Sequence, residues 1–324
     1  MTETTYIGAI TRALHEEMQR DENVVLMGED IGAYGGAFKA TDGLQKKFGE
    51  ARVMDTPLAE LGLVGAAIGM SYMGFRPVVE FQFIDFIACG FDQIVNFAAT
   101  SRYRWGHACP LVLRGPWGGG VRGNMYHSRN VEMWFVHSPG LKVVAAGTAR
   151  DALGLLKSAI RDPDPVLYLE HKHLYRRVKE DLPDGEILTP IGKADVARAG
   201  EHVTVVTYGW MRHVCLDAAR ELEKEGISIE VIDLRTLYPM DRAAVVESVK
   251  KTNRCLVVHE DTRTGGIAGE VAMTVFEEAF DHLDAPVLRV TAPDTPVPYS
   301  PPLEDYFLPK VADVVKACRK LVKY

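Results

Sequence analysis

Two residues have the clearest potential for chemistry: a glutamate near the start of a predicted helix and a histidine on a glycine-rich segment. Glu60 follows the run Asp55-Thr56-Pro57-Leu58-Ala59, and His127 follows Gly118-Gly119-Gly120-Val121-Arg122-Gly123. Carboxylates and imidazoles are the side chains that proteins use most to move protons near neutral pH. Both residues are therefore candidates for proton transfer, although a lone histidine is by default a surface or satisfied core residue.

The setting of Glu60 favours a functional acid over a helix cap. Pro57 suits the first position of a helix, which places Glu60 in the first turn. A capping box needs Ser or Thr three residues before the acid, and that position is proline. An acid favoured by the helix dipole remains the simpler alternative. The apolar neighbours predict at least partial burial, however, and a buried acid needs a partner or a task; they are Leu58, Leu61, Leu63 and Val64. Glycines give the same helix a narrow side that another helix or a ligand can approach, at Gly62, Gly65 and Gly69.

The glycine-rich segment fits the literal pattern of a dinucleotide-binding turn but lacks its context. That site needs a helix that starts at the last glycine and an acid about 20 residues further on. The chain continues instead with Asn124-Met125-Tyr126-His127-Ser128, and no such acid follows. We interpret the segment as a loop that brings backbone close to a ligand. The absence of a Walker A sequence argues against nucleotide phosphoryl transfer.

Apolar strand-like runs alternate with helical patterns along most of the chain. In the first part we predict a helix with an apolar face from Ile7 to Met18, capped by Thr4 or Thr5. Strands are predicted at 24–27, 77–81, 111–113, 143–145 and 166–169, with helices at 58–73, 85–102 and 149–160. Such alternation predicts a parallel sheet covered by helices on both faces.

The segment 178–190 changes character and marks a domain boundary. It contains acids, prolines and a glycine within a short span, which is typical of a linker. Beyond it the alternation restarts, with strands at 203–208, 229–234, 256–259 and 287–290 and helices at 214–225, 242–251, 268–280 and 310–322. The prolines between 293 and 302 predict an extended segment without regular structure. We therefore predict two successive parallel-sheet α/β domains, 1–180 and 191–324, joined by a linker at 181–190.

Composition narrows the class of protein. Of 324 residues, 47% are hydrophobic and 25% are charged, the balance of a soluble globular protein. A net charge of −7 argues against nucleic acid or an anionic membrane as the main partner. No secretory signal is recognisable, and the five scattered cysteines favour reduced thiols in a cytoplasmic protein over disulfides or a zinc site.

Several strings, in order along nearly the whole chain, resemble the beta subunits of the E1 component of 2-oxo acid dehydrogenase complexes. They are Gly28-Glu29-Asp30-Ile31-Gly32, Asp55-Thr56-Pro57-Leu58-Ala59-Glu60-Leu61-Gly62, Glu80-Phe81-Gln82, Arg114-Gly115-Pro116, His127-Ser128, His137-Ser138-Pro139-Gly140-Leu141-Lys142-Val143-Val144 and Val231-Ile232-Asp233-Leu234-Arg235-Thr236-Leu237-Tyr238-Pro239. The resemblance implies a fold in which a domain like the pyrimidine-binding domain of transketolase precedes one like its C-terminal domain.

The resemblance also implies a thiamine diphosphate site and assigns residues to it. In that family a glutamate at the position of Glu60 hydrogen-bonds N1′ of the aminopyrimidine and so activates the cofactor, a form of acid–base catalysis relayed through the ring. Leu58, Gln82 and Phe86 match residues that line the cofactor and substrate pocket, although Phe86 could equally be ordinary core. His127 matches a histidine near the reacting carbon, with a role in proton transfer during reductive acylation.

A structural cation is a further implication of the resemblance. Related subunits hold a cation at the end of the helix predicted at 149–160, where the sequence is Ala159-Ile160-Arg161-Asp162-Pro163-Asp164-Pro165. The ligands expected here for K⁺ or Mg²⁺ are the side chains of Asp162 and Asp164 and the carbonyls of Leu111, Val112 and Ala159. The alternative is a helix end stopped by proline and followed by a turn.

One motif of thiamine enzymes is missing. The chain has no Gly-Asp-Gly string of the kind that anchors Mg²⁺ and the diphosphate; the nearest are Thr41-Asp42-Gly43 and Pro183-Asp184-Gly185. By analogy with the family, an alpha subunit supplies this half of the site and most of the Mg²⁺ binding, in a heterotetramer of two alpha and two beta subunits. The family resemblance also implies docking to the dihydrolipoyl acyltransferase E2, through its subunit-binding and lipoyl domains.

The substrate is expected to be a branched-chain 2-oxo acid. The strings Arg114-Gly115-Pro116-Trp117-Gly118 and Tyr126-His127-Ser128 resemble enzymes for 2-oxoisovalerate and its homologues more than those for pyruvate. A pyruvate or acetoin dehydrogenase E1 beta subunit is the enzymatic alternative. A supporting subunit without catalytic residues is the non-enzymatic one, and the presence of both Glu60 and His127 argues against it.

Overall fold

The computed structural model describes residues 2–324 and divides into two compact units. The first unit contains residues up to Trp117 and the range Trp134–Ile191. The second contains Gly118–Met133 and Gly192–Tyr324. The predicted domain limits did not anticipate that residues 118–133, which include His127, group with the second unit.

The first unit is built on a parallel sheet whose strands run in the order β6-β7-β5-β4-β2-β3. Its strands are β2 (Val24–Gly28), β3 (Val53–Asp55), β4 (Arg76–Glu80), β5 (Val112–Trp117), β6 (Lys142–Ala146) and β7 (Val166–His171). β2, β5 and β7 are buried along their whole length, as expected for strands covered on both faces. Two further strands, β1 (Thr2–Thr5) and β8 (Lys179–Leu182), pair antiparallel with each other.

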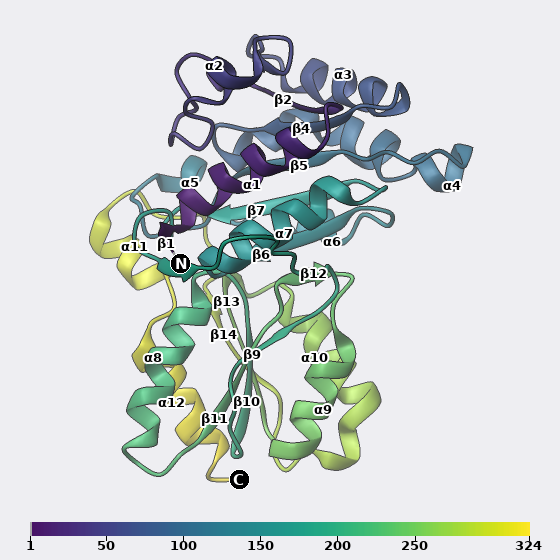
Figure 1. Ribbon diagram of the computed structural model, residues 1–324. Helices are drawn as coiled ribbons and strands as arrows, with labels where there is room; N and C mark the ends of the chain where they lie inside the picture. The colour runs from purple at the N-terminus through teal and green to yellow at the C-terminus, as the bar shows by residue number, and fades with distance from the viewer. Residues whose placement is uncertain (1) are drawn as a thin grey trace. The chain divides into compact units, whose positions relative to one another are not determined.

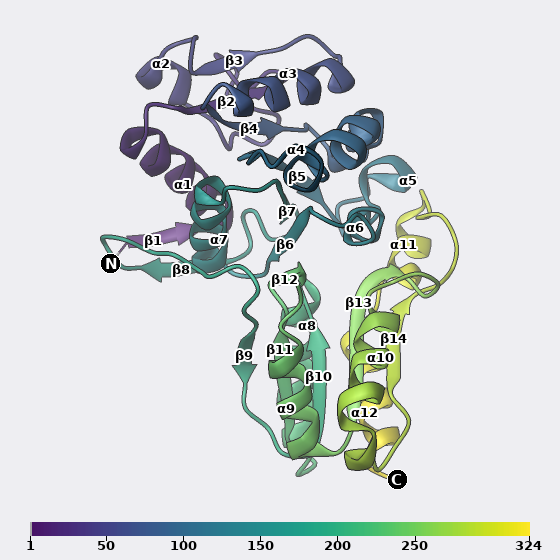
Figure 2. The ribbon, with the colours of Figure 1, turned by 90° about the vertical axis from the view of Figure 1, so that its right-hand side faces the viewer.

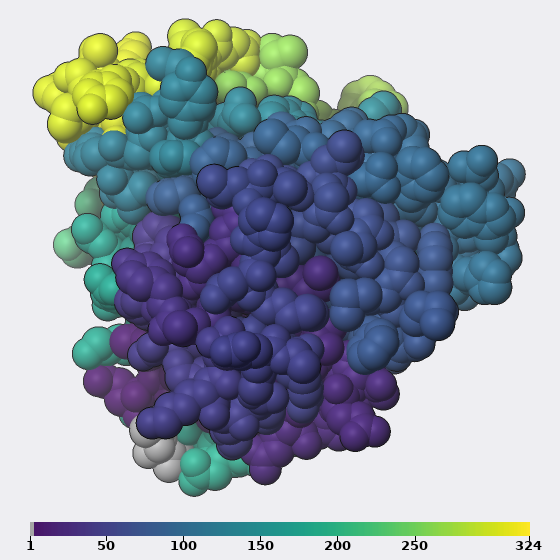
Figure 3. All heavy atoms as spheres, turned by 90° about the horizontal axis from the view of Figure 1, so that it is seen from above, coloured from purple at the N-terminus to yellow at the C-terminus, as the bar shows by residue number. Residues whose placement is uncertain are grey.

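Helices cover both faces of this sheet (Figure 1, Figure 2). On one face α1 packs along α7, and on the other α3 packs against η1 and η2. These helices are α1 (Tyr6–Arg20), α3 (Glu60–Tyr72), η1 (Ile84–Gly90), η2 (Gln93–Ala98) and α7 (Ala149–Arg161), accompanied by the short α2 (Leu44–Phe48) and α4 (Ser101–Trp105). Figure 3 looks down on this unit from the side on which α2 and α3 lie in Figure 1.

Helix α1 shows how the sequence sets these elements. Thr5 is its N-cap, and the Thr5 hydroxyl accepts a hydrogen bond from the backbone N–H of Gly8 at 3.1 Å. The predicted apolar face is buried at Ile10, Leu14 and Met18, whereas Ile7 is only half-buried. The prediction of a capped, amphipathic opening helix is therefore confirmed.

The second unit carries a five-stranded sheet in the order β14-β13-β10-β11-β9. The strands of this unit are β9 (Asp195–Arg198), β10 (Val203–Thr207), β11 (Ile229–Asp233), β12 (Thr236–Tyr238), β13 (Cys255–Thr262) and β14 (Leu288–Ala292). Neighbouring strands are parallel except for β9, which lies antiparallel to β11 at the edge. Sequence patterning predicted parallel sheets and missed this edge strand, because β9 is short and only partly buried.

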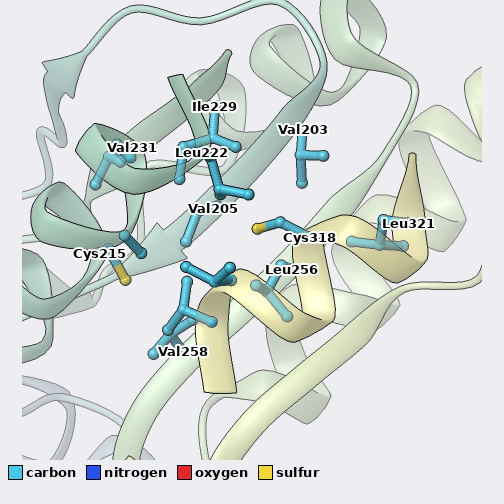
Figure 4. Close-up of a cluster of buried hydrophobic side chains, with 14 of the residues drawn as sticks. Val203, Val205, Cys215, Leu222, Ile229, Val231, Leu256, Val258, Cys318 and Leu321 are labelled. Carbon is cyan, nitrogen blue, oxygen red and sulfur yellow. The ribbon is translucent and has the colours of Figure 1, made fainter. Parts of the chain in front are cut away.

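Two helix pairs enclose the second sheet, α8 with α12 on one face and α9 with α10 on the other (Figure 1). Their bounds, with the short helices of this part of the chain, are α5 (Asn124–His127), α6 (Glu132–Val136), α8 (Met211–Glu223), α9 (Arg242–Thr252), α10 (Ala268–Ala279), η3 (Phe280–His282), α11 (Pro301–Phe307) and α12 (Val311–Leu321). Figure 4 shows the core on the α8–α12 side, where strand residues such as Val205 and Leu256 meet Cys215 and Cys318. All five cysteines are free thiols.

Three predicted elements differ in detail. The prolines at 301 and 302 begin α11 rather than continuing an extended segment, since proline is tolerated in the first turn of a helix. The long helix predicted at 85–102 is broken into η1, η2 and α4. The predicted linker is not free, because Asp181 and Leu182 belong to β8 and Thr189 is buried against α7. No helix in the range 2–324 is long and apolar enough to span a bilayer.

Candidate active site

The candidate site lies at the carboxyl edge of the first sheet. The parallel register aligns Gly28 with Asp55 and with Glu80, so the segments after β2, β3 and β4 leave the sheet side by side. Ligands of open α/β sheets bind outside this edge. Two hydrogen bonds join these segments: Gly32 N–H donates to Asp55 Oδ1 at 2.7 Å, and Gln82 Nε2 donates to Asp30 Oδ2 at 3.0 Å.

Glu60 is the first residue of α3, directly after this edge. The helix begins three residues later than Pro57 predicts, but Glu60 still lies in its first turn. The N-cap is Ala59, and no side chain caps the helix. Glu60 is half-buried. The capping-box explanation is therefore excluded by geometry as well as by sequence.

Glu29 is an acid that the sequence reasoning quoted but did not assign to the site. It follows β2, and its side chain is buried. Burial, followed by the charges of Glu60 and Asp30, raises the pKa of the Glu29 carboxyl above its usual value. Among residues 2–324 its Oε1 atom has no hydrogen-bond partner, and neither has the buried hydroxyl of Thr56, which follows β3. A buried polar atom in this condition needs an explanation, and a ligand or water that completes its bonding is one.

The other predicted cofactor residues belong to the same unit. Phe86 lies in η1, which approaches the first turn of α3 so closely that a Cβ at Gly90 would stand 3.4 Å from the Glu60 carbonyl oxygen. Gln82 is fixed by its bond to Asp30. Leu58 is 80% exposed. The structure thus gathers Glu60, Gln82 and Phe86 near one edge, together with an apolar side chain that the chain itself leaves uncovered.

His127 belongs to the second unit, at the end of the one-turn helix α5. Its backbone N–H donates to the Gly123 carbonyl at 3.1 Å, and the Ser128 hydroxyl accepts from Gly123 N–H at 2.8 Å. A Cβ at Gly123 would stand 2.6 Å from the His127 carbonyl oxygen, so only glycine fits this turn. The glycine-rich segment therefore forms a tight turn that presents His127.

Two other buried carboxylates near the same edge differ from Glu29 in that both are paired with an arginine. Arg114 on β5 is buried and bonds Glu80 on β4 and Glu170 on β7, with Nη2 at 2.8 Å from Glu170 Oε2. The Tyr175 hydroxyl donates to Glu170 at 2.7 Å. Burial alone would lower the pKa of Arg114, but the charges of Glu170 and Glu80 raise it well above its usual value. This network is closed and serves to join three strands.

The predicted cation ligands bond to other groups of the chain. The Asp162 carboxylate accepts two bonds from the Lys142 ammonium, at 2.7 and 2.6 Å, and Asp164 accepts from Arg102 at 2.7 Å. The Leu111 and Ala159 carbonyls accept backbone N–H groups, while Val112 lies within β5. Across residues 2–324 no group of three or more His, Cys, Asp or Glu side chains could hold a metal ion. The cation ligands remain a prediction.

Comparisons with known proteins agree with this arrangement. The family model described as "Transketolase, pyrimidine binding domain" matches residues 2–178, and that described as "Transketolase, C-terminal domain" matches residues 192–314. The 2-oxoisovalerate dehydrogenase subunit beta of Bacillus subtilis is 50% identical, and the pyruvate dehydrogenase E1 component subunit beta of the same organism is 48% identical; each alignment covers 100% of both chains. A solved structure titled "Split gene transketolase, inactive beta4 tetramer" is similar with a TM-score of 0.81 and 26% identity, over 99% of this chain and 98% of that one.

The fold and the site thus define a chain of the transketolase type, with a pyrimidine-binding domain followed by a C-terminal domain. Within that class, the chain belongs to the beta subunits of the E1 component of 2-oxo acid dehydrogenases. The resemblance read from the sequence strings and the predicted fold class are confirmed.

Proposed function

We propose that the chain acts with an alpha subunit as the E1 component of a branched-chain 2-oxo acid dehydrogenase. The reaction is the thiamine-diphosphate-dependent oxidative decarboxylation of 2-oxoisovalerate and its homologues, with transfer of the acyl group to the lipoyl group of E2. The observation that carries the proposal is the uncapped Glu60 at the carboxyl edge, beside a buried Glu29 with an unpartnered oxygen. The 50% identity to a 2-oxoisovalerate dehydrogenase subunit supports the substrate class.

The residues at this edge fit the aminopyrimidine half of thiamine diphosphate. Glu60 would hold a proton at the ring nitrogen N1′, and the apolar Leu58 and Phe86 would pack on the ring and exclude water, which strengthens that hydrogen bond. Gln82 would keep the segment after β4 in place through Asp30. When bound, the cofactor would supply a nucleophilic thiazolium carbon and an electron sink for the decarboxylation of the 2-oxo acid. His127 would move a proton during acyl transfer to the lipoyl sulfur.

The exposed side of α3 supports the need for an alpha subunit. This helix is apolar on all sides, and such helices are normally buried. In this chain Leu61 is 51% exposed and Met73, just after the helix, is 79% exposed. A Cβ at Gly69 would meet no atom within 4 Å. The chain itself does not explain these residues, whereas a second subunit packed along α3 would.

A bulky side chain at Gly69 tests this subunit contact. Gly69→Leu has room in the isolated chain, so we expect it to fold but to lose assembly with the alpha subunit. Gly269→Leu is the matched control, because Gly269 is also a helical glycine at which a Cβ would meet no atom within 4 Å, but it lies on α10. Co-expression with the alpha subunit and light scattering would report the assembly. Normal heterotetramers with Gly69→Leu would remove α3 from the interface.

The remaining assignments also belong to the proposal. We expect the alpha subunit to hold Mg²⁺ and the diphosphate in a heterotetramer of two alpha and two beta subunits. E2 would contribute its subunit-binding and lipoyl domains as the downstream partner. Five free thiols favour a reducing compartment, and we propose the cytoplasm.

The substrate is tested by reconstitution with the alpha subunit. The ratio of kcat/KM for 2-oxoisovalerate over pyruvate is expected to exceed about tenfold, the size of discrimination that one or two methylene groups in an apolar pocket provide. A preference for pyruvate or acetoin would overturn the branched-chain assignment but keep the mechanism, and the 48% identity to a pyruvate dehydrogenase subunit favours this as the second candidate. No thiamine-dependent turnover with any 2-oxo acid would favour a supporting subunit.

A further inference from the structure

Buried carboxylates of the second unit bind the backbone of the glycine-rich segment 118–123. Gly120 N–H donates to Glu304 Oε1 at 2.8 Å, and Gly119 N–H donates to Glu260 Oε1 at 3.3 Å. Glu304 and Glu260 are 0% and 2% exposed. Hydrogen bonds from N–H groups to ionised acceptors are stronger than neutral ones, and more so away from water. Two buried carboxyl groups of the second unit therefore hold the segment through its backbone N–H groups.

This arrangement explains the glycines without a ligand on the loop backbone. Gly118 and Gly120 have φ angles of +85° and +80°, which direct the successive N–H groups toward the carboxylates. A Cβ at Gly119 would stand 2.9 Å from Leu308 Cδ2. The chain groups that approach these glycines are Glu260, Glu304 and Leu308, and the approach of a ligand to the loop stays a prediction.

The side chain of Arg122 adds further hydrogen bonds between the glycine-rich segment and α11. The Arg122 guanidinium donates to the Pro301 carbonyl at 3.0 Å, to Glu304 Oε2 at 3.3 Å and to Asp305 Oδ1 at 2.7 Å. These acceptors all lie in the first turns of α11, which the prolines at 301 and 302 begin. Glu304 therefore bonds the loop twice, through the Gly120 backbone and through Arg122.

The chain that follows His127 is also fixed within the second unit. Glu132 is fully buried and accepts from the Tyr208 hydroxyl at 2.6 Å and from Asn130 Nδ2 at 2.9 Å. Tyr208 directly follows β10. The chain is thus anchored on both sides of His127. Glu304 and Glu260 hold the residues before it, and the bond between Glu132 and Tyr208 holds the residues after it.

We propose that Glu304 and Glu260 are positioning residues that set the place of His127, so that the C-terminal domain governs acyl transfer to the lipoyl group. This rests on the role proposed above for His127. Glu60 and the pyrimidine-binding edge belong to the other unit, and none of these hydrogen bonds involves them. Loss of the anchor should therefore slow acyl transfer more than decarboxylation.

The test separates the two half-reactions of the enzyme reconstituted with its alpha subunit. Decarboxylation is followed with 2-oxo acid and an artificial electron acceptor, and acyl transfer is followed on the isolated lipoyl domain of E2. We expect Glu304→Ala to lower acyl transfer about tenfold, the effect of one lost charged hydrogen bond, with decarboxylation within about twofold of wild type. Glu304→Gln keeps an acceptor for Gly120 N–H and should restore most of the loss. Arg122→Gln changes an exposed side chain and should give a smaller, selective loss even if Glu304→Ala does not fold.

Glu230→Ala is the matched control. Glu230 is a buried acid of the same unit that accepts from a glycine, Gly200 N–H at 3.2 Å, and pairs with Lys251. Its removal should lower thermal stability without changing the ratio of the two half-reactions. An equal fall of both half-reactions with Glu304→Ala, like that caused by a general loss of stability, would overturn the positioning role.

A double variant identifies His127 as the residue through which Glu304 acts. In a His127→Ala background, Glu304→Ala should have little further effect on acyl transfer, since residues that act as a unit are not additive. Multiplying losses would contradict the inference. If His127→Ala alone leaves acyl transfer intact, the role proposed for His127 is the part that fails. A selective effect of His127→Ala that Glu304→Ala does not reproduce would leave that role standing and reject the anchor.

Discussion

Helices α3 and α7 of the first unit both carry an acid in the first turn and a glycine in the interior, but their surroundings differ. In α7, Thr148 is the N-cap and accepts from Asp151 N–H at 3.0 Å. The buried Asp151 carboxylate in turn accepts from the hydroxyls of Thr148 at 2.9 Å and Thr189 at 3.2 Å. In α3 the N-cap is Ala59, and no side chain caps the helix that Glu60 begins.

The interior glycines of α7 and α3 also differ in their surroundings. A Cβ at Gly154 of α7 would stand 2.4 Å from Thr189 Oγ1, so the fold itself requires glycine there. A Cβ at Gly69 of α3 would meet nothing within 4 Å. The chain itself therefore explains Asp151 and Gly154 of α7, whereas it does not explain Glu60 and Gly69 of α3. Residues that the fold leaves unexplained are the ones to assign to a cofactor or a partner.

The largest expected effects come from exchanging the two first-turn acids for alanine. Glu60→Ala should lower thiamine-dependent decarboxylation by about 100-fold or more, the usual contribution of a proton-transfer group, with little change in stability. Asp151→Ala should leave kcat of the folded enzyme close to wild type but lower the free energy of unfolding by about 1–3 kcal/mol, because two buried hydroxyls lose their acceptor. Steady-state kinetics of the reconstituted enzyme and urea denaturation of each variant measure both quantities.

The same variants can show that α3 and α7 do not differ in the way proposed. Full activity of Glu60→Ala would remove Glu60 from the reaction and leave it a helix-dipole acid. A large loss of stability in Glu60→Ala, without a catalytic effect beyond it, would make α3 an ordinary structural helix like α7.

Sequence patterning predicted most of the fold because buried parallel strands and amphipathic helices carry strong periodic signals. Strands such as β2 and β7 and helices such as α1 and α7 lie within a few residues of their predicted limits. Short elements with exposed or mixed patterns were missed, among them β3, β8, β9 and α11. A three- or four-residue strand has too few positions to show a period, and two prolines read as a break unless their place in the first turn is known.

The candidate site was predictable only in part. Glu60 and His127 could be proposed from the sequence because their types and local settings are unusual and match a known family, and their roles stay predictions. Glu29, Glu260 and Glu304 were not, because burial of an acid by residues distant in the chain leaves no local signal. Their hydrogen bonds join positions as far apart as Gly120 and Glu304, which only the tertiary structure brings together.

The second comparison exchanges the interior glycines for alanine. Gly154→Ala should lower the free energy of unfolding by about 1–3 kcal/mol, since the new methyl group overlaps the Thr189 hydroxyl that holds Asp151. Gly69→Ala should raise it by about 0.5–1 kcal/mol, because alanine favours the helix and nothing opposes its side chain. Chemical denaturation of the isolated beta chain measures both. A destabilising Gly69→Ala would show that α3 is packed against its own chain after all.

The smallest expected effect concerns pH and the carboxyl of Glu29, which has no counterpart beside α7. Its pKa in the folded chain is raised, chiefly by burial and then by the charge of Glu60, above the value of 4.5 expected in the unfolded chain. Below that value the Glu29 carboxyl is protonated in both the folded and the unfolded chain, and the stabilisation of the fold by the raised pKa is fully present. This stabilisation is lost as the pH rises through the pKa of the folded chain, because the unfolded chain then releases the proton more readily.

Glu29→Gln removes this loss, so its free energy of unfolding should exceed that of wild type at pH 7. The difference should be only about 0.5 kcal/mol, because solvent at the sheet edge screens part of the charge. The free energies of unfolding of variant and wild type should converge near pH 4. Glu22→Gln, at an exposed position of the same unit, is the control and should follow the wild-type curve. Denaturation curves between pH 4 and pH 8 measure the difference. If Glu29→Gln is less stable than wild type at pH 7, the carboxylate is paired within the chain, and the unpartnered oxygen no longer distinguishes Glu29 from the satisfied Asp151 of α7.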